Sequence, residues 1–331
     1  MARNQAIGST AVPVARGEGL GSDLPPLPTR ALGRTGRQVG LFGLGGEGIL
    51  RTQGRQAEAT AMIRRAVDQG VNYFDTAPAY ASSMDYLGAA FREILGAGWG
   101  QPGRRFAAPT GPGGVSAGRM CGRTDMFLAS KTADRTRAGS LKILDNTLQR
   151  LGTDYLDLWQ LHDLRTIEDL DRIFAKGGAI EALTTARADG RVKHLGLTGH
   201  HDPAVLLEGL RRFPFDTLLV ALNAGDVHVH SFVREVLPLA MQQGLGVIGM
   251  KCCAQGRLLD PGLLSMDEAL GYVLSLTGVS LTIIGCMTPA HVDDNARIVR
   301  AFRPIPAAQR QALEARTKAK QAEITYYKKG H

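Results

Sequence analysis

Four polar side chains in the first half of the sequence are of the right types to carry out acid–base chemistry together. They are Asp75 and Tyr80 in the segment FDTAPAY, Lys131 in FLASK, and His162 in LWQLH. A tyrosine has a pKa of about 10, but a lysine ammonium beside it favours the phenolate and lowers that pKa. Asp75 would keep Lys131 charged and in place. His162 would hydrogen-bond a carbonyl oxygen while Tyr80 protonates it. The set predicts proton transfer to a carbonyl whose carbon receives a hydride, with no metal required.

Each of these residues also has a purely structural interpretation. Asp75 and Lys131 could form an ion pair that only holds the fold. His162 could be a satisfied interior histidine, and Tyr80 could be a loop aromatic. Their positions favour chemistry, because they end or closely follow three successive apolar runs of the sequence.

The elements that must position these residues alternate between short apolar runs and amphipathic stretches. This alternation predicts parallel strands flanked by helices, and eight such units predict a (β/α)8 barrel. The carboxyl ends of the strands carry the functional residues in such a barrel. The predicted strands are residues 41–46, 71–75, 125–131, 155–162, 192–198, 217–223, 246–251 and 281–285.

Other segments frame the predicted barrel. Residues 1–28 are rich in Gly, Pro and Ser and are expected to form a flexible tail, which leaves 29–331 as a single domain. A hairpin is predicted over 32–39. Helices are predicted over residues 57–70, 140–152 and 233–244, with an extra one at 306–322. The Gly- and Pro-rich connection at 96–123 and the segment 224–232 are expected to shape substrate choice.

The composition indicates a globular protein that acts on small molecules. The chain has 331 residues, of which 44% are hydrophobic and 21% charged, and a net charge of +8. The basic residues are spread along the chain. The short runs Arg104-Arg105, Arg211-Arg212 and Lys328-Lys329 are interpreted as solvated surface, and no nucleic-acid partner is expected. No apolar run is long enough to span a bilayer, so a cytoplasmic protein is predicted. It is expected to be a monomer or a weak homo-oligomer.

Two motifs in the sequence offer alternative sites. Gly43, Gly45 and Gly48 match the G-x-G-x-x-G of a Rossmann phosphate loop, but no helix opens directly after them. His200-His201 and the pair His228 and His230 could bind zinc, but their spacing shows no tetrahedral set, so no metal is predicted. Two alternative functions also stay open: a barrel hydrolase using Asp75 and Asp163, and a non-catalytic regulator on the same scaffold.

From about residue 30 to residue 303 the sequence resembles the aldo-keto reductase family. The segments that carry the resemblance are FDTAPAY, LASK, LQRLGTDYLDLWQLHD, GRVKHLGLTGH and IIGCMTPAHVDDNAR. It implies a (β/α)8 TIM barrel with an N-terminal hairpin and a C-terminal extra helix. It implies NAD or NADP as cofactor, a small carbonyl or alcohol substrate, and Asp75, Tyr80, Lys131 and His162 as the catalytic tetrad. The motifs at 162–163 and 195–199 most resemble the branch that oxidises sugars at carbon 1.

The resemblance also implies a set of cofactor contacts. Thr198 and Gly199 would adjoin the nicotinamide carboxamide, and Asp294 and Asn295 the adenine. Lys251, Cys253 and Gln255 would lie in the loop around the pyrophosphate. The other implied contacts are Gly46, Asp75, Asn223, Met250, Gly285 and His291.

The sequence departs from the family at several of these positions. Gly199 replaces an asparagine, Met250 an aromatic residue, and Ala81 the glycine that usually follows the catalytic tyrosine. Gly285 and His291 stand where many members place the Lys and Arg that bind the 2′-phosphate of NADP. NAD and NADP therefore both remain open. Trp99 in the 96–123 connection is a candidate for the pocket wall.

Overall fold

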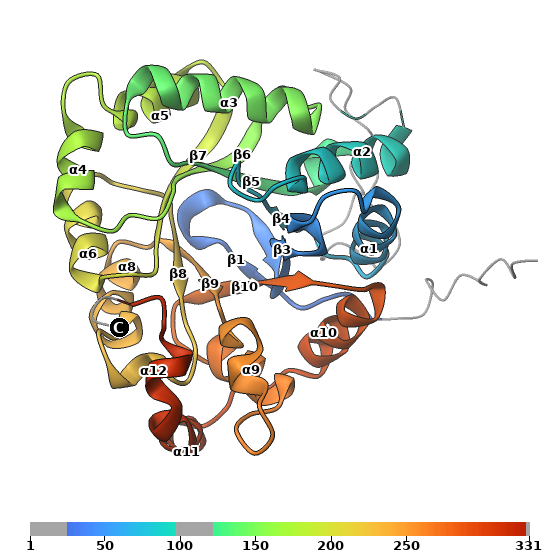
Figure 1. Ribbon diagram of the computed structural model, residues 1–331, viewed down its shortest axis with the longest axis vertical. Helices are drawn as coiled ribbons and strands as arrows, with labels where there is room; N and C mark the ends of the chain where they lie inside the picture. Colours follow the sequence, from blue (N-terminus) through green and yellow to red (C-terminus); the bar gives the residue numbers. More distant parts are fainter. Residues whose placement is uncertain (1–24, 97–98, 100–121, 329–331) are drawn as a thin grey trace, which may run out of the picture.

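Eight parallel strands close into a barrel in the order β10-β3-β4-β5-β6-β7-β8-β9 (Figure 1), as predicted. The computed structural model describes residues 25–96, 99 and 122–328. The barrel strands are β3 (Phe42–Gly48), β4 (Tyr73–Asp75), β5 (Phe127–Thr132), β6 (Leu156–Leu161), β7 (Val192–Gly199), β8 (Thr217–Ala221), β9 (Gly246–Met250) and β10 (Val279–Cys286). The predicted tail lies outside the described residues up to residue 24, and Leu27 is already buried against the barrel.

The predicted hairpin closes the amino-terminal end of the barrel. It consists of β1 (Thr29–Ala31) and β2 (Gln38–Gly40), joined by a turn that contains η1 (Gly33–Thr35). Arg30 donates to the carbonyl oxygen of Val279 at 2.7 Å, and Arg37 donates to that of Thr124 at 3.0 Å. Leu32 is fully buried in the cluster that fills the barrel interior. The hairpin is thus tied to the loops that lead into the strands, and the barrel opens at the opposite end.

Helices surround the strands (Figure 1). Apolar side chains form a continuous buried layer between them. They are α1 (Gln56–Asp68), α2 (Ser83–Leu95), α3 (Arg137–Leu151), α4 (Ile167–Phe174), α5 (Ala179–Ala188), α6 (Pro203–Arg212), α7 (Phe232–Glu235), α8 (Leu237–Gln242), α9 (Met266–Leu274), α10 (Pro289–Ala301), α11 (Ala307–Thr317) and α12 (Gln321–Ile324). No helix among the described residues is both long and apolar enough to cross a membrane.

Two predicted helices are each interrupted. The stretch 233–244 divides into α7 and α8, because Pro238 has no N–H to donate and can only begin a new helix. The stretch 306–322 divides into α11, η7 (Lys318–Lys320) and α12. Thr317 Oγ1 there bonds to the carbonyl oxygen of Ala224, which ties the end of α11 to the loop after β8. The interruption turns the chain back toward the barrel.

The glycine-rich segment at 43–48 is barrel strand β3, so it is not a Rossmann phosphate loop. A Cβ at Gly43 would lie 2.9 Å from Tyr73 Cδ1 and 3.0 Å from Leu281 Cδ1. Gly48 has a φ of 69°, in the left-handed region. Close packing inside a barrel and one left-handed residue therefore explain these glycines.

Candidate active site

An ion pair between neighbouring strands lies at the open end of the barrel. Lys131 on β5 donates to Asp75 at the end of β4, with 2.5 Å between Nζ and Oδ1 and each side chain 1% exposed. Lys131 Nζ also donates to the carbonyl oxygen of Thr76 at 3.0 Å. Burial works against the ammonium, but Asp75 and Tyr80 outweigh it and raise the pKa of Lys131. Lys131 is therefore cationic at neutral pH.

This ion pair does not use all its hydrogen-bonding capacity. An ammonium has three protons, and Asp75 and Thr76 accept two of those of Lys131, which leaves the third for Tyr80. Asp75 Oδ2 is buried and has no hydrogen-bond partner among the described residues. Burial raises the pKa of the Asp75 carboxyl, and Lys131 opposes the rise.

Tyr80 packs over Lys131 in the turn between β4 and α2. Its ring centroid lies 4.8 Å from Lys131 Nζ and 5.9 Å from that of the His162 ring, with the two rings perpendicular. A Cβ at Gly46 would lie 2.6 Å from Tyr80 Cδ2, so only glycine leaves room for the tyrosine. Burial raises the pKa of Tyr80, and Lys131 opposes that rise. The predicted effect of the lysine is present, but burial outweighs it, so Tyr80 keeps its proton at neutral pH.

His162 follows the last residue of β6 and is neutral. Burial, and after it the charge of Lys131, lower its pKa to about 3. One ring nitrogen of a neutral imidazole can donate a hydrogen bond. Arg135 donates to the carbonyl oxygens of His162 and Asp163 at 2.9 and 3.2 Å. These bonds hold a backbone in which Asp163 has a φ of 52°.

The four residues line one cavity of about 680 Å³ at this end of the barrel. This volume lies within the range of about 300–1,000 Å³ that is typical of ligand pockets. Part of the wall is apolar, from Ala79, Met250, Ile283, Ile284 and Met287. The rest carries charged and polar groups: Glu47, Arg51, Asp163, Arg165, Thr198, His200, Lys251, Gln255 and His291.

Most of the predicted cofactor residues line the same cavity. These are Gly46, Asp75, Thr198, Met250, Lys251, Cys253, Gln255, Gly285 and His291. The other four, Gly199, Asn223, Asp294 and Asn295, lie outside its lining. Gly199 packs against α6, where a Cβ would lie 2.8 Å from Leu206 Cδ2. Asn295 is buried and donates to Cys286 Sγ at 3.5 Å.

The cavity wall suits a long anionic cofactor such as a dinucleotide. Lys251 brings positive charge to it, and Arg51 brings a guanidinium that is paired with Glu47. The loop after β9 contains four left-handed φ angles: 55° at Lys251, 49° at Ala254, 57° at Gln255 and 92° at Gly256. Non-glycine residues in this region are strained and mark functional loops. The residues present therefore fit the cofactor that the sequence predicts.

Two pairs of charged or polar residues were not expected from the sequence. Glu47 and Arg51 form an ion pair of 2.9 Å at the cavity rim, and the Arg51 guanidinium lies 5.7 Å from the centroid of the Tyr80 ring. On the other side, His200 Nε2 lies 3.3 Å from Asp163 Oδ1. The four-residue spacing of opposite charges at 47 and 51 was the available signal for the first pair.

Several predicted features have other roles in the structure. Trp99 is not a pocket wall: its indole N–H donates to the carbonyl oxygen of Leu151 between α2 and α3. His228 Nε2 contacts the carbonyl oxygen of Glu314, away from His200. Over the described ranges, no group of three or more His, Cys, Asp or Glu side chains could hold a metal ion.

Comparisons with known proteins agree with this geometry. The sequence model of the Aldo/keto reductase family matches residues 38–267. The chain is 30% identical to L-galactose dehydrogenase from Arabidopsis thaliana, over 86% of this chain and 92% of that protein. It is 30% identical to pyridoxal 4-dehydrogenase from Microbacterium luteolum, over 66% of this chain and 68% of that protein.

Solved structures share the fold. An aldo-keto reductase from Klebsiella pneumoniae in complex with NADPH superposes with a TM-score of 0.66 at 20% identity, over 89% of this chain and 96% of that one. With the family match and the barrel-end cavity, the conclusion is direct: this chain belongs to the aldo/keto reductase family of NAD(P)-dependent oxidoreductases.

Proposed function

We propose that this enzyme interconverts an alcohol and a carbonyl compound with Tyr80 as the general acid and base. One observation carries the proposal: Tyr80 lies between the Lys131 ammonium and the neutral His162 ring at the wall of a single cavity. Proton transfer requires a group that holds a proton at neutral pH and whose negative charge is stabilised after the proton has left. Tyr80 meets the first condition, and Lys131 provides the second.

Each residue then has a definite part in carbonyl reduction. The nicotinamide cofactor supplies the hydride when it is bound. Tyr80 donates its proton to the carbonyl oxygen, and Lys131 stabilises the phenolate that remains. His162 donates a hydrogen bond that orients the same oxygen. In alcohol oxidation Tyr80 must first lose its proton, which Lys131 favours and burial opposes, and the phenolate then accepts the proton of the alcohol.

The polar side of the cavity favours a hydroxylated substrate. Asp163 and His200 face the cavity next to His162. His200 Nδ1 is buried without a hydrogen bond among the described residues, and Asp163 Oδ1, which lies 3.3 Å from His200 Nε2, also makes no hydrogen bond of regular geometry among them. Sugar hydroxyls could both donate to the carboxylate and interact with the imidazole. Because one relative is named L-galactose dehydrogenase, we propose an aldose, oxidised at carbon 1 to its lactone, as the substrate class.

The cofactor can be NAD or NADP. A side chain at Gly285 would begin 2.8 Å from Glu47 Cβ, so a lysine at that position would collide with β3. His291 lies at the cavity and is exposed. In place of a dedicated 2′-phosphate clamp at these two positions, the positive charge of Lys251 lines the cavity, and both cofactors can use it.

A hydrolase with Asp75 and Asp163 as its carboxylates is not favoured. Asp75 is 1% exposed and is committed to Lys131, whereas hydrolysis needs one carboxyl that can protonate a leaving group. Turnover with a nicotinamide cofactor separates the proposed enzyme from a non-catalytic regulator. If NAD, NADP and their reduced forms neither bind nor turn over with any sugar or aldehyde tested, the proposal fails.

The Tyr80→Phe variant tests the catalytic role directly. We expect it to lower kcat by at least about 10²-fold, since a positioned acid or base contributes about 10²–10⁴. Its affinity for cofactor, measured by fluorescence quenching, should stay within about twofold. Tyr155→Phe is the matched control, because Tyr155 packs between Arg123 and Lys193, away from the cavity. Substrates to test are L-galactose, other aldoses and pyridoxal, followed by absorbance of the reduced nicotinamide.

A further inference from the structure

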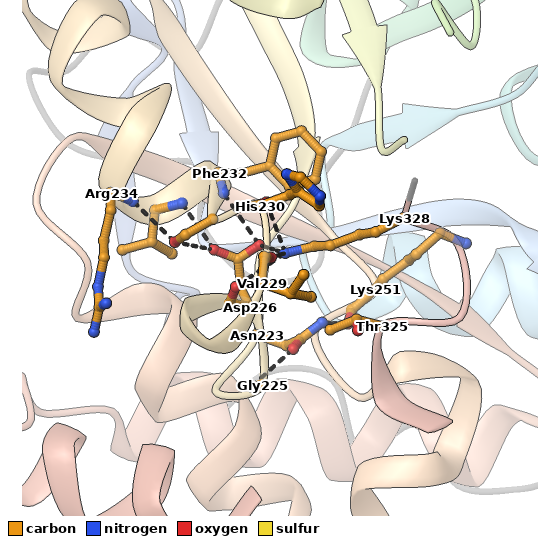
Figure 2. Close-up of polar contacts among 12 residues, drawn as sticks. Asn223, Gly225, Asp226, Val229, His230, Phe232, Arg234, Lys251, Thr325 and Lys328 are labelled. Atoms are coloured by element: carbon orange, nitrogen blue, oxygen red, sulfur yellow. Dashed lines mark hydrogen bonds and ion pairs between the residues drawn. The ribbon is translucent and has the colours of Figure 1, made fainter. Parts of the chain in front are cut away.

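The last described residues of the chain, Thr325 to Lys328, fold back against the loop after β8 (Figure 2). Lys328 is fully buried, and its Nζ lies 2.5 Å from Asp226 Oδ1. It also donates to the carbonyl oxygens of Asp226, Val229 and His230 at 2.9–3.0 Å. The expectation that the run 328–329 is solvated surface is wrong for Lys328, since four acceptors enclose its ammonium.

Asp226 is held by its own loop as well as by the lysine. Its Oδ2 accepts from Ser231 Oγ at 2.7 Å and from the Val233 N–H at 2.9 Å, and its Oδ1 accepts from the Phe232 N–H at 3.2 Å. Figure 2 shows these bonds converging on the carboxylate. Asp226 therefore has three donors from its own loop in addition to Lys328, and these three would remain if Lys328 left.

Tyr327 connects this chain end to the cavity wall. Asn223 Nδ2 bonds both to the Tyr327 hydroxyl at 2.9 Å and to the carbonyl oxygen of Lys251 at 3.1 Å. The Lys251 ammonium lies 5.2 Å from the centroid of the Tyr327 ring. The His200 ring also packs against Tyr327, perpendicular to it, at 5.7 Å between centroids. One buried aromatic side chain thus contacts two residues that line the cavity.

We propose that residues 325–328 form a clasp that holds Lys251 and His200 in place, so that cofactor binding and docking of this segment are coupled. Lys251 has strained backbone, with a φ of 55°, and needs neighbours to keep it there. Asn223, bonded to Tyr327, supplies that hold. Lys328 is the anchor of the clasp. The inference rests on the proposed use of Lys251 in cofactor binding.

Burial of the Lys328 ammonium opposes docking of the clasp. Burial lowers the pKa of Lys328, while Asp226 opposes the change, so keeping the ammonium inside costs free energy. Coupling is reciprocal: if docking strengthens cofactor binding, bound cofactor stabilises docking by the same factor.

The Lys328→Met variant tests the anchor, because it keeps the stem and removes the charge. We expect its Kd for NADPH or NADH, measured by fluorescence, to rise by about tenfold, within the usual range of coupling. At saturating cofactor its kcat should stay within about twofold of the wild type. Lys318→Met is the matched control, since Lys318 is exposed in η7 of the same region. Circular dichroism and urea unfolding check that each variant is folded.

A second measurement reads the clasp without activity. Carboxypeptidase should remove residues 325–328 more slowly when cofactor is present, and this protection should be lost in Lys328→Met. Tyr327→Phe, which removes only the hydroxyl that bonds Asn223, should weaken binding by a few-fold and tests the link if Lys328→Met does not fold.

The outcomes separate the two proposals. If the wild type binds no nicotinamide cofactor, the proposed function fails. If the wild type binds cofactor and both Lys328→Met and Tyr327→Phe bind it equally well, with no protection of the chain end, the clasp is overturned and the proposed function stands.

Discussion

Two buried lysine–aspartate pairs in this barrel have the same central distance and different surroundings. Lys131 with Asp75, and Lys328 with Asp226, each place 2.5 Å between Nζ and Oδ1, with both partners almost fully buried. In the Lys328 pair four oxygens surround the ammonium, and backbone N–H groups and a hydroxyl saturate the carboxylate. In the Lys131 pair one proton is directed at Tyr80 and Asp75 Oδ2 has no partner among the described residues.

This difference shows how one ion pair can take part in a reaction while another only stabilises the structure. A saturated pair holds two segments together and has nothing left to offer a ligand. An unsaturated pair holds its charge in place and keeps an interaction available for a reacting group. A reactive lysine–aspartate pair can therefore be distinguished from a structural one by polar atoms that remain without a hydrogen-bond partner.

The largest expected effect comes from removing the reactive cation. Lys131→Met should lower kcat by about 10³-fold, because the Tyr80 phenolate loses its stabilising charge. Lys328→Met should leave kcat nearly unchanged at saturating cofactor. Steady-state kinetics of the two variants measure this contrast. Equal losses of kcat would show that the two pairs do not differ as described.

The free energy of unfolding should also fall more in Lys131→Met than in Lys328→Met. Lys131→Met leaves the buried Asp75 charge without its ion-pair partner, which costs about 3–5 kcal/mol. In Lys328→Met the Asp226 carboxylate keeps three donors, so we expect a loss of about 1–2 kcal/mol. Urea unfolding at pH 7 gives both values. A larger loss for Lys328→Met would contradict the assigned difference in saturation.

A pH series sharpens the contrast around the reactive pair. Burial lowers the pKa of His162 to about 3 and that of His200 to about 4. The unfolded chain protonates both below about pH 6.5, whereas the folded protein does not, so stability falls as the pH drops from 6.5 toward 4. Between pH 7 and pH 5 we expect a loss of about 2–4 kcal/mol from the pair.

His200→Asn should reduce this acid-dependent loss by about 1–2 kcal/mol. His291→Asn is the control variant, since His291 is exposed. The free energy of unfolding is measured at both pH values for each protein. An unchanged loss in His200→Asn would show that this histidine is not held neutral.

The smallest expected effect concerns the backbone beside each pair. Ala81 follows Tyr80 with a φ of 42°, and His230, whose carbonyl oxygen binds Lys328, has a φ of 38°. Glycine removes a left-handed backbone strain of about 1–2 kcal/mol. It also raises the conformational entropy of the unfolded chain, which offsets part of this gain. Ala81→Gly and His230→Gly should each stabilise the fold by about 0.5 kcal/mol, measured by thermal unfolding. A loss of stability in either would exclude strain there.

Local patterns in the sequence were enough to predict the barrel and to bring Asp75, Tyr80, Lys131 and His162 to one end of it. Each strand is a compact apolar run, and Asp75, Lys131 and His162 stand at or just past strand ends, which the barrel gathers at one opening. The breaks at Pro238 and Thr317 were missed for different reasons. The proline was visible in the sequence, whereas Thr317 acts through the carbonyl oxygen of Ala224, far away along the chain.

The clasp was beyond sequence reasoning. Asp226 and Lys328 are 102 residues apart, belong to no motif, and are types that usually face solvent. The sequence also predicts that the pKa of Tyr80 is lowered, whereas in the structure it is raised. The cation beside Tyr80 is visible in the sequence, but the stronger effect of burial depends on how tightly the turn packs. Long-range pairing and the degree of burial are set by tertiary structure.

The hairpin that closes the amino-terminal end of the barrel also bears on the order of events in the proposed catalytic cycle. Leu32 of this hairpin belongs to the apolar cluster that fills the barrel interior, so the cavity does not continue through the barrel as a channel. In the proposed reaction, cofactor and substrate would therefore both enter at the open end of the barrel. If one of them covers the other there, binding and release should follow a compulsory order, which product-inhibition kinetics would reveal.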